Sequence, residues 1–230
     1  MAGVSPARII TIDGPSGSGK GTVARLTADQ LGWRLLDSGA LYRLVAYEGE
    51  RRGLLPDDEP GFADAARNLA VRFGLSPEGE EAIWLNGDEV SRALRTEQAG
   101  EGASRVAAMP SVRAALMDRQ RAFAGPPGLV ADGRDMGTVV FPEAGLKIYL
   151  TATAEERARR RYNQLKDKGL GANLAALSLE IAERDRRDAS RPIAPLRPAD
   201  DAVIVDSTSM TIEAVVARVL EQAAARFPVK

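Results

Sequence analysis

A glycine-rich segment near the start of the chain has the residue types and spacing to bind phosphate groups. It follows an apolar run at residues 9–12 and leads into an amphipathic stretch at residues 23–31, so we expect strand, loop and helix in that order. Glycines let successive backbone N–H groups turn inward toward an anion, and the helix N-terminus adds partial positive charge. The residues predicted to hold the phosphates are Gly14, Pro15, Ser16, Gly17, Ser18, Gly19, Lys20, Gly21 and Thr22.

Two side chains of this loop can act on the phosphates directly. Lys20 brings a point charge to the outer phosphates, and Thr22 offers a hydroxyl near a metal ion. Gly21 separates them, whereas the simplest phosphate-loop pattern has Ser or Thr directly after the lysine. The Gly-Lys-Gly-Thr form resembles the loop of nucleoside monophosphate kinases. It leaves open whether Thr22 contacts magnesium directly or through water.

An acidic motif follows a later apolar run, at residues 129–131. It reads Asp132-Gly133-Arg134-Asp135-Met136-Gly137. An aspartate after a strand is often structural, but beside a phosphate loop this is the position that holds magnesium through water. We therefore assign Asp132 to the metal and place Arg134 and Asp135 at the mouth of the cleft.

A second polar motif, Asp37-Ser38-Gly39, ends another apolar run and is followed by Tyr42 and Arg43 in a helical pattern. Ser38 alone could be a helix N-cap. That reading does not explain why Asp37, Tyr42 and Arg43 arrive together where a strand ends, which in parallel sheets is the ligand-binding edge.

Two arginine-rich stretches form a third group. Arg157 and Arg161 lie four residues apart with no acidic residue three or four positions away, so they repel unless an anion lies between them. A nucleotide phosphate would be such an anion. Arg159 and Arg160 instead have glutamates four residues earlier, and we interpret them as a solvated, salt-bridged face.

The second stretch places Arg184, Asp188 and Arg191 on one helical face, with Arg187 nearby. A charged surface helix is the alternative for this stretch, because Glu180 and Glu183 can pair with the arginines four residues on.

Composition limits the function further. The chain of 230 residues has 31 basic and 32 acidic residues, a net charge of −1, and neither histidine nor cysteine. Imidazole and thiolate chemistry are therefore excluded, and a nucleic-acid polymer has no overall electrostatic attraction to the chain. With no signal-peptide pattern and no membrane-length apolar run, we expect a cytoplasmic protein without a membrane partner.

The elements that must position these residues alternate along the chain. We expect strands at 8–12, 33–36, 129–131, 147–150 and 203–205, and helices at 21–31, 40–52, 111–124, 154–168, 173–189 and 211–227. This pattern predicts an α/β fold with a parallel sheet covered by helices on both faces. Residues 57–96 break the alternation, and Asn86-Gly87 after a strand-like run indicates a small antiparallel hairpin.

Taken together, these motifs resemble the bacterial cytidylate kinases, a family of nucleoside monophosphate kinases. The resemblance covers nearly the whole chain and rests on residues 12–22, 36–43, 131–142, 183–191 and 206–208. The Asp-Gly-Arg-Asp-Met-Gly-Thr block is its most specific part. Adenylate kinase-like chains typically have Asp-Gly-Phe-Pro-Arg there, and the Asn-Lys-x-Asp motif of a GTP switch is absent. A kinase for UMP, AMP or shikimate, and a nucleotide-dependent switch, remain the competing interpretations.

The resemblance implies phosphoryl transfer from ATP to CMP or dCMP with Mg²⁺, in a monomer. It implies a core at 1–56, 106–156 and 192–230, a monophosphate-binding insertion at 57–105, and a short lid with phosphate-binding arginines at 157–191. The residues that it assigns to catalysis are Lys20, Arg134, Arg157, Arg161, Arg184 and Arg187. The metal would lie at Thr22 and Asp132.

For the acceptor nucleotide, the resemblance implies that Ser104, Arg113 and Asp135 read the cytosine. A carboxylate there attracts the amino group of cytosine and repels the carbonyl of uracil. The remaining residues that it assigns to the acceptor are Asp37, Ser38, Tyr42, Arg43, Arg134, Arg184, Asp188 and Arg191.

Overall fold

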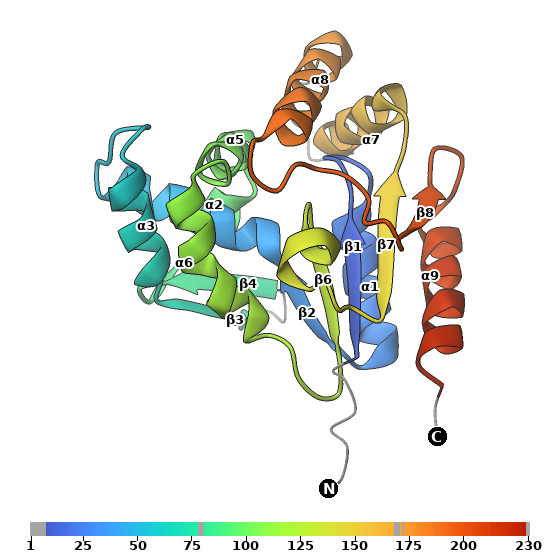
Figure 1. The fold of residues 1–230 in the computed structure, drawn as a ribbon. Coiled ribbons are helices and arrows are strands. Elements are labelled where there is room, and N and C mark those ends of the chain that lie inside the picture. Colours follow the sequence, from blue (N-terminus) through green and yellow to red (C-terminus); the bar gives the residue numbers. More distant parts are fainter. Residues whose placement is uncertain (1–7, 78–80, 168–170, 172, 229–230) are drawn as a thin grey trace, which may run out of the picture. The chain divides into compact units, whose positions relative to one another are not determined.

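The computed structural model describes residues 8–77, 81–167, 171 and 173–228. Its elements form two compact units (Figure 1). The core unit comprises Met1–Asp37 and Gln120–Lys230, and the inserted unit comprises Ser38–Arg119. The inserted unit is wider than the insertion predicted at 57–105, because α2 (Ser38–Arg51) packs closely against α3 (Glu59–Arg67) and α5 (Glu97–Val106).

The core unit is built on a five-stranded sheet in the order β2-β6-β1-β7-β8, in which every neighbouring pair is parallel. The strands are β1 (Ile9–Asp13), β2 (Arg34–Asp37), β6 (Leu129–Gly133), β7 (Leu146–Thr151) and β8 (Val203–Asp206). All five lie within one or two residues of the positions predicted from the apolar runs. The predicted α/β class with a parallel sheet is therefore confirmed.

Helices cover this sheet according to the alternation of side chains along its strands. Ile10 and Ile12 of β1 point to one face and pack against α1 (Lys20–Leu31) and α9 (Ile212–Arg226) in the main apolar cluster. Thr11 points to the other face, where the short π-helix η1 (Met136–Val140) packs on β1. α7 (Ala154–Asp167) and α8 (Leu174–Ser190) pack against each other (Figure 1).

The inserted unit contains the predicted antiparallel hairpin. β3 (Val71–Leu75) pairs with β4 (Glu81–Leu85), and β4 pairs with β5 (Asp88–Glu89). Asn86 and Gly87 connect β4 to β5 with φ values of 53° and 93°, as a two-residue turn with positive φ at both positions requires.

Short helices of the inserted unit were not predicted. Besides α3 and α5 these include α4 (Ser91–Leu94), whereas α6 (Pro110–Arg121) corresponds to the helix predicted at 111–124. The sequence does carry their start signals, because Asp58 caps α3 by accepting from Gly61 N and Thr96 caps α5 by accepting from Ala99 N. The anomalous section is thus a mixed helical and antiparallel unit.

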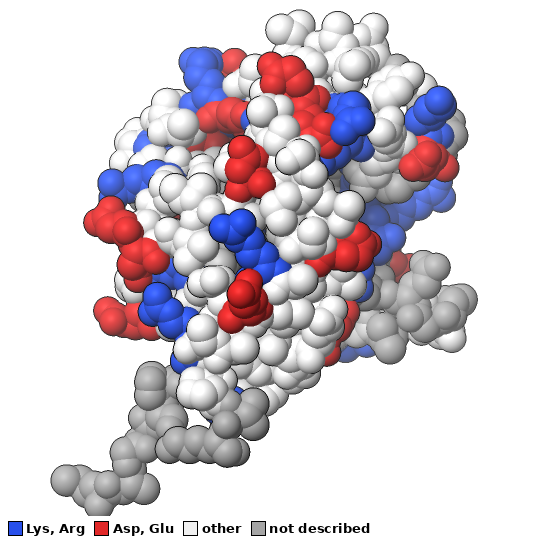
Figure 2. All heavy atoms as spheres, turned by 90° about the vertical axis from the view of Figure 1, so that its right-hand side faces the viewer, with Lys and Arg blue, Asp and Glu red and all other residues white. Residues whose placement is uncertain are grey.

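The outer surface shows no extended region of one charge on the face drawn in Figure 2, where basic and acidic side chains are interspersed. Among the described residues, no helix is both long enough and apolar enough to span a bilayer.

Candidate active site

The predicted phosphate-binding loop joins β1 to α1 at the carboxyl edge of the sheet. Gly14 is required by close approach, because a Cβ at this position would collide with the Leu150 carbonyl oxygen of the neighbouring strand. Gly19 has φ 87° and forms the N-cap of α1, a left-handed conformation that glycine adopts without strain. The free N–H groups of the first turn of α1 therefore lie directly beyond this loop.

Lys20 is the first residue of α1 and is 9% exposed. Its Nζ donates to the Pro15 carbonyl at 3.2 Å, so the side chain folds back over the loop. Burial lowers the pKa of Lys20 to about 7, with Arg134 and Arg184 lowering it and Asp132 and Asp37 raising it. Lys20 thus lies near two arginines at the loop, and an anion bound among them would favour the charged form of the lysine.

Asp132 lies beside the start of α1, and its Oδ2 leaves little room for a side chain at position 21. A Cβ on Gly21 would stand only 3.2 Å from that oxygen. This contact gives a physical reason for glycine where the simplest phosphate-loop pattern has Ser or Thr. Asp132 pairs in register with Ile12 of β1 and with Asp37 of β2, so both predicted carboxylates lie at the same sheet edge.

Asp13 has a role that sequence reasoning did not assign. Its carboxylate accepts hydrogen bonds from the backbone N–H groups of Met136 and Gly137, both at 2.8 Å. These residues begin η1, so Asp13 fixes the turn that carries Arg134 and Asp135. Asp135 is 2% exposed and precedes η1 as its N-cap.

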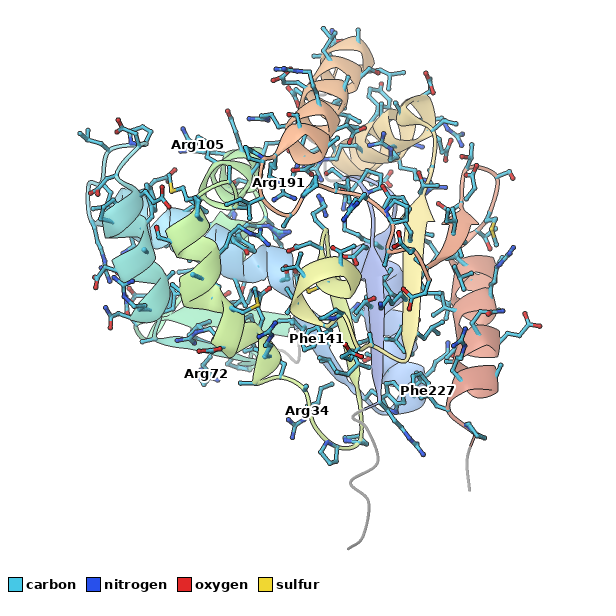
Figure 3. All side chains as sticks on the ribbon, in the orientation of Figure 1. Arg34, Arg72, Arg105, Phe141, Arg191 and Phe227 are labelled. Atoms are coloured by element: carbon cyan, nitrogen blue, oxygen red, sulfur yellow. The ribbon has the colours of Figure 1, made fainter. Side chains whose placement is uncertain are left out.

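Arg134 reaches the helix that carries the second predicted arginine group. Its Nε donates to Asp188 Oδ2 of α8 at 2.9 Å, and Nη1 donates to its neighbouring carbonyl of Gly133. Burial alone would raise the pKa of Asp188, but Arg134, Arg191 and Arg184 together lower it. The predicted grouping of Arg184, Asp188 and Arg191 is therefore found, with Arg191 after the last turn of α8 (Figure 3).

Arg157 is also brought to the loop, but its guanidinium contacts protein groups. It donates to the carbonyls of Ser16 at 2.9 Å and Ala152 at 3.0 Å, and both terminal nitrogens pair with the carboxylate of Asp185. Arg161, on the next turn, donates to Gln164, and burial lowers its pKa while Glu180 raises it. Asp185 of α8 thus pairs with Arg157, and a nucleotide phosphate between the two arginines stays a prediction.

Arg160 differs from the solvated residue that its sequence spacing predicted. The expected pairing with Glu156 is present, at 2.9 Å. The same guanidinium also donates to the carbonyls of Ser18 and Ser207 and to the Ser207 hydroxyl. No motif indicated these contacts, because both partners are backbone or small polar groups distant in sequence. Arg187 lies half-buried on α8.

The residues predicted to bind the acceptor within the inserted unit lie on three helices. α2 begins at Ser38 and carries the buried Tyr42 and the half-buried Arg43. Ser104 lies on α5, and Arg113 on α6. Arg113 is 4% exposed, and its guanidinium stands over the Tyr42 ring with its carbon 5.9 Å from the ring centre. Tyr42 and Arg113 are therefore neighbours, although no sequence spacing linked them.

Comparisons with known proteins agree with the geometry of the core unit. A model of the family described as cytidylate kinase matches residues 10–225. The cytidylate kinase of Stutzerimonas stutzeri is 57% identical over 224 residues, which cover 97% of this chain and 98% of that protein. That of Azotobacter vinelandii is 58% identical over 219 residues, covering 95% and 96%. A solved shikimate kinase from Bacteroides thetaiotaomicron aligns with 94% of this chain and 98% of its own at 16% identity, with a TM-score of 0.44, too low to add to the argument.

Proposed function

The chain belongs to the cytidylate kinase family, whose members phosphorylate a nucleoside monophosphate with ATP, and we propose that its acceptors are CMP and dCMP. The products would be ADP and CDP or dCDP. The observation that carries this proposal beyond the family match is the convergence of Lys20, Arg134 and Arg184 at the phosphate loop. Two half-buried arginines beside a buried lysine suit two polyanionic substrates that must approach each other.

The chemistry requires no general base. The attacking group is a phosphate oxygen that is already ionised at neutral pH, so the absence of histidine removes nothing that the reaction needs. The protein then contributes positioning and neutralisation of charge on the transferring phosphoryl group. We propose Lys20 and Arg134 for that role, and the lid arginines assigned by resemblance likewise stay predictions.

Magnesium fits the donor set at the loop. Asp132 presents a carboxylate oxygen next to Gly21, and Thr22 follows with a hydroxyl on the exposed side of α1. Magnesium usually takes one or two carboxylates together with the phosphates of its nucleotide, so a cage of several acidic residues is not needed. Asp132 and Thr22 would hold the ion, which would neutralise charge on the ATP phosphates.

The assignment of ATP to the loop is tested by Lys20→Ala. We expect turnover to fall at least about a hundredfold, as on the loss of one electrostatic stabiliser, in a protein that still folds. The assay is ADP release with AMP, CMP, dCMP, UMP and GMP as acceptors. Near-native turnover in the folded variant would contradict the loop assignment, and a preference for another acceptor in the wild type would contradict the proposed substrates.

The cytosine reading is tested separately by Asp135→Asn. An amide can donate to the uracil carbonyl as well as accept, and one base contact contributes about 1–3 kcal/mol of discrimination. The CMP:UMP ratio of kcat/KM should therefore fall about ten- to a hundredfold. Asp29→Asn, which removes an exposed carboxylate from α1, is the matched control and should leave the ratio unchanged. An unchanged ratio in Asp135→Asn would remove Asp135 from base recognition.

A further inference from the structure

The phosphate-binding loop is held from outside by arginines of α7 that donate to its carbonyl groups. Arg160 Nη1 lies 3.2 Å from the Ser18 carbonyl oxygen, and Arg157 Nη1 lies 2.9 Å from that of Ser16. A Cβ on Gly17 would stand 3.1 Å from Arg157 Cβ, which shows how closely α7 approaches the loop. The two carbonyls that flank Gly17 therefore both point toward α7.

The direction of each carbonyl also fixes the direction of the N–H group in the same peptide. The Ser18–Gly19 peptide is trans, so its carbonyl and its N–H point in opposite directions. When the Ser18 carbonyl points out to Arg160, the Gly19 N–H must point inward, to the side where α1 begins. A flip of this peptide would present a carbonyl oxygen to the phosphate in place of a donor.

Arg160 also ties the loop to a second segment of the core unit. It donates to the carbonyl and hydroxyl of Ser207, which follows β8, and Ser207 N donates to Thr151 O at 2.8 Å. Ser207 is 2% exposed and belongs to the sheet edge, so this anchor is rigid. Glu156 holds the remaining Nε at 2.9 Å. The guanidinium therefore cannot follow the loop if the peptide turns.

We propose that Arg160 is a positioning residue of the kinase, which locks the Ser18–Gly19 peptide so that the Gly19 N–H faces the ATP phosphates. Arg160 acts through the backbone and contacts no reacting atom. The proposal deepens the function proposed above and rests on the binding of ATP by residues 14–22.

The chain offers a matched control for this residue. Arg159 precedes it on α7 and pairs with the same Glu156, but its side chain is 65% exposed and that of Arg160 is 25% exposed. Arg159→Met and Arg160→Met thus each remove one positive charge, and each takes one arginine partner away from Glu156. Only the second variant removes the charged donor of the Ser18 carbonyl, which then keeps the weaker contact from Ser207 Oγ at 3.4 Å.

The test measures ATP and CMP kinetics and the affinity for ADP in both variants. Arg160→Met should raise the KM for ATP and the Kd for ADP at least about tenfold, as on the loss of a charge-assisted hydrogen bond, while the KM for CMP changes little. Arg159→Met should match the wild type. Arg160→Lys keeps the charge but has a single donor group on a longer stem, so it should lie between the two.

A direct readout is the Gly19 amide resonance in ¹⁵N-labelled protein. Added ADP should shift it strongly in the wild type and in Arg159→Met, and only weakly in Arg160→Met. Equal KM, Kd and amide shifts in the two methionine variants would overturn the proposal. Equal rises in the KM values of ATP and CMP would also overturn it, because they would indicate a general structural defect.

Two further measurements keep the outcomes distinct. If Arg160→Met fails to fold, Arg160→Lys decides, because the single nitrogen of lysine cannot reach Glu156, Ser207 and the Ser18 carbonyl together. An unchanged Gly19 shift and Kd for ADP in that variant would contradict the lock. Lys20→Ala is run in parallel. If it retains turnover, the loop assignment itself fails. If it loses turnover while Arg160→Met behaves like Arg159→Met, the role of Arg160 alone is refuted.

Discussion

The ion pair between Arg157 and Asp185 should be one of the electrostatic attachments of α8 to the rest of the core unit, beside the pair of Arg134 and Asp188. Both terminal nitrogens of Arg157 contact the Asp185 carboxylate, and the Arg157 side chain is 5% exposed. Asp185→Asn keeps the shape of the side chain, but it removes the charge and places an amide nitrogen against one donor of the guanidinium. We expect the free energy of unfolding to fall.

The size of this effect follows from burial. Removing one partner of a fully buried ion pair costs about 3–5 kcal/mol, because an uncompensated charge remains inside. Asp185 is 29% exposed, so water screens part of the charge, and Arg157 keeps its bonds to the Ser16 and Ala152 carbonyls. We therefore expect a loss of about 2 kcal/mol. For a chain of this size, that corresponds to a fall in Tm of about 4–8 °C.

Glu183→Gln is the matched control on the same helix. It removes one negative charge two residues away, but its pair with Arg186 is exposed, at 51% and 72% for the two side chains. Exposed pairs of this kind contribute about 0–1 kcal/mol. Thermal and urea unfolding of both variants at neutral pH measure the difference. If Asp185→Asn is no less stable than Glu183→Gln, the pair does not attach α8 and the reasoning from burial is wrong.

Three further results are expected. Gly14→Ala should destabilise the protein by more than about 3 kcal/mol, because the new methyl group meets the Leu150 carbonyl; a folded, active variant would contradict the close approach. Burial raises the pKa of Asp13 from 3.8 to about 7, so the native state binds this proton more tightly and Asp13 lowers stability as pH rises from about 4 to 7. Urea unfolding of wild type relative to Asp13→Asn should show that decline, by up to about 4 kcal/mol, and a difference independent of pH would refute it. Asn86→Ala should cost about 1–2 kcal/mol in thermal unfolding, because φ 53° strains alanine and the bond to Glu48 is lost, whereas Asn86→Gly should cost less.

The elements of the core unit were predictable because short stretches of sequence determine them. The apolar runs that form β1, β6 and β7 are buried along nearly their whole length, and the glycines mark the loop between β1 and α1. The Asn86-Gly87 turn was predictable for the same reason, since two residues alone set its backbone. The capped helices α3 and α5 were missed although they are amphipathic, because each is only 9 or 10 residues long and lies beside the segment interpreted as a hairpin.

Contacts through backbone groups were not predictable. Asp13 directly follows the strand predicted at 8–12, but the N–H groups of η1 that it binds carry no sequence signature. Arg160 was assigned to the surface because a glutamate stands four residues earlier, and that pairing is real. The error was to treat one partner as the whole environment of a side chain with several donors.

Because an arginine has several N–H donors, a chain of net charge −1 can still present a site for phosphate groups. Lys20 feels the positive charges of Arg134 and Arg184 at the loop, and carboxylates of the same unit hold these groups in place. Asp188 holds Arg134 through one nitrogen, and Asp185 holds Arg157. Each carboxylate offsets a charge in the total, but an arginine has five donors and one carboxylate accepts only some of them. Net charge therefore excludes a broad attraction to polymers and says little about a local site for phosphate groups.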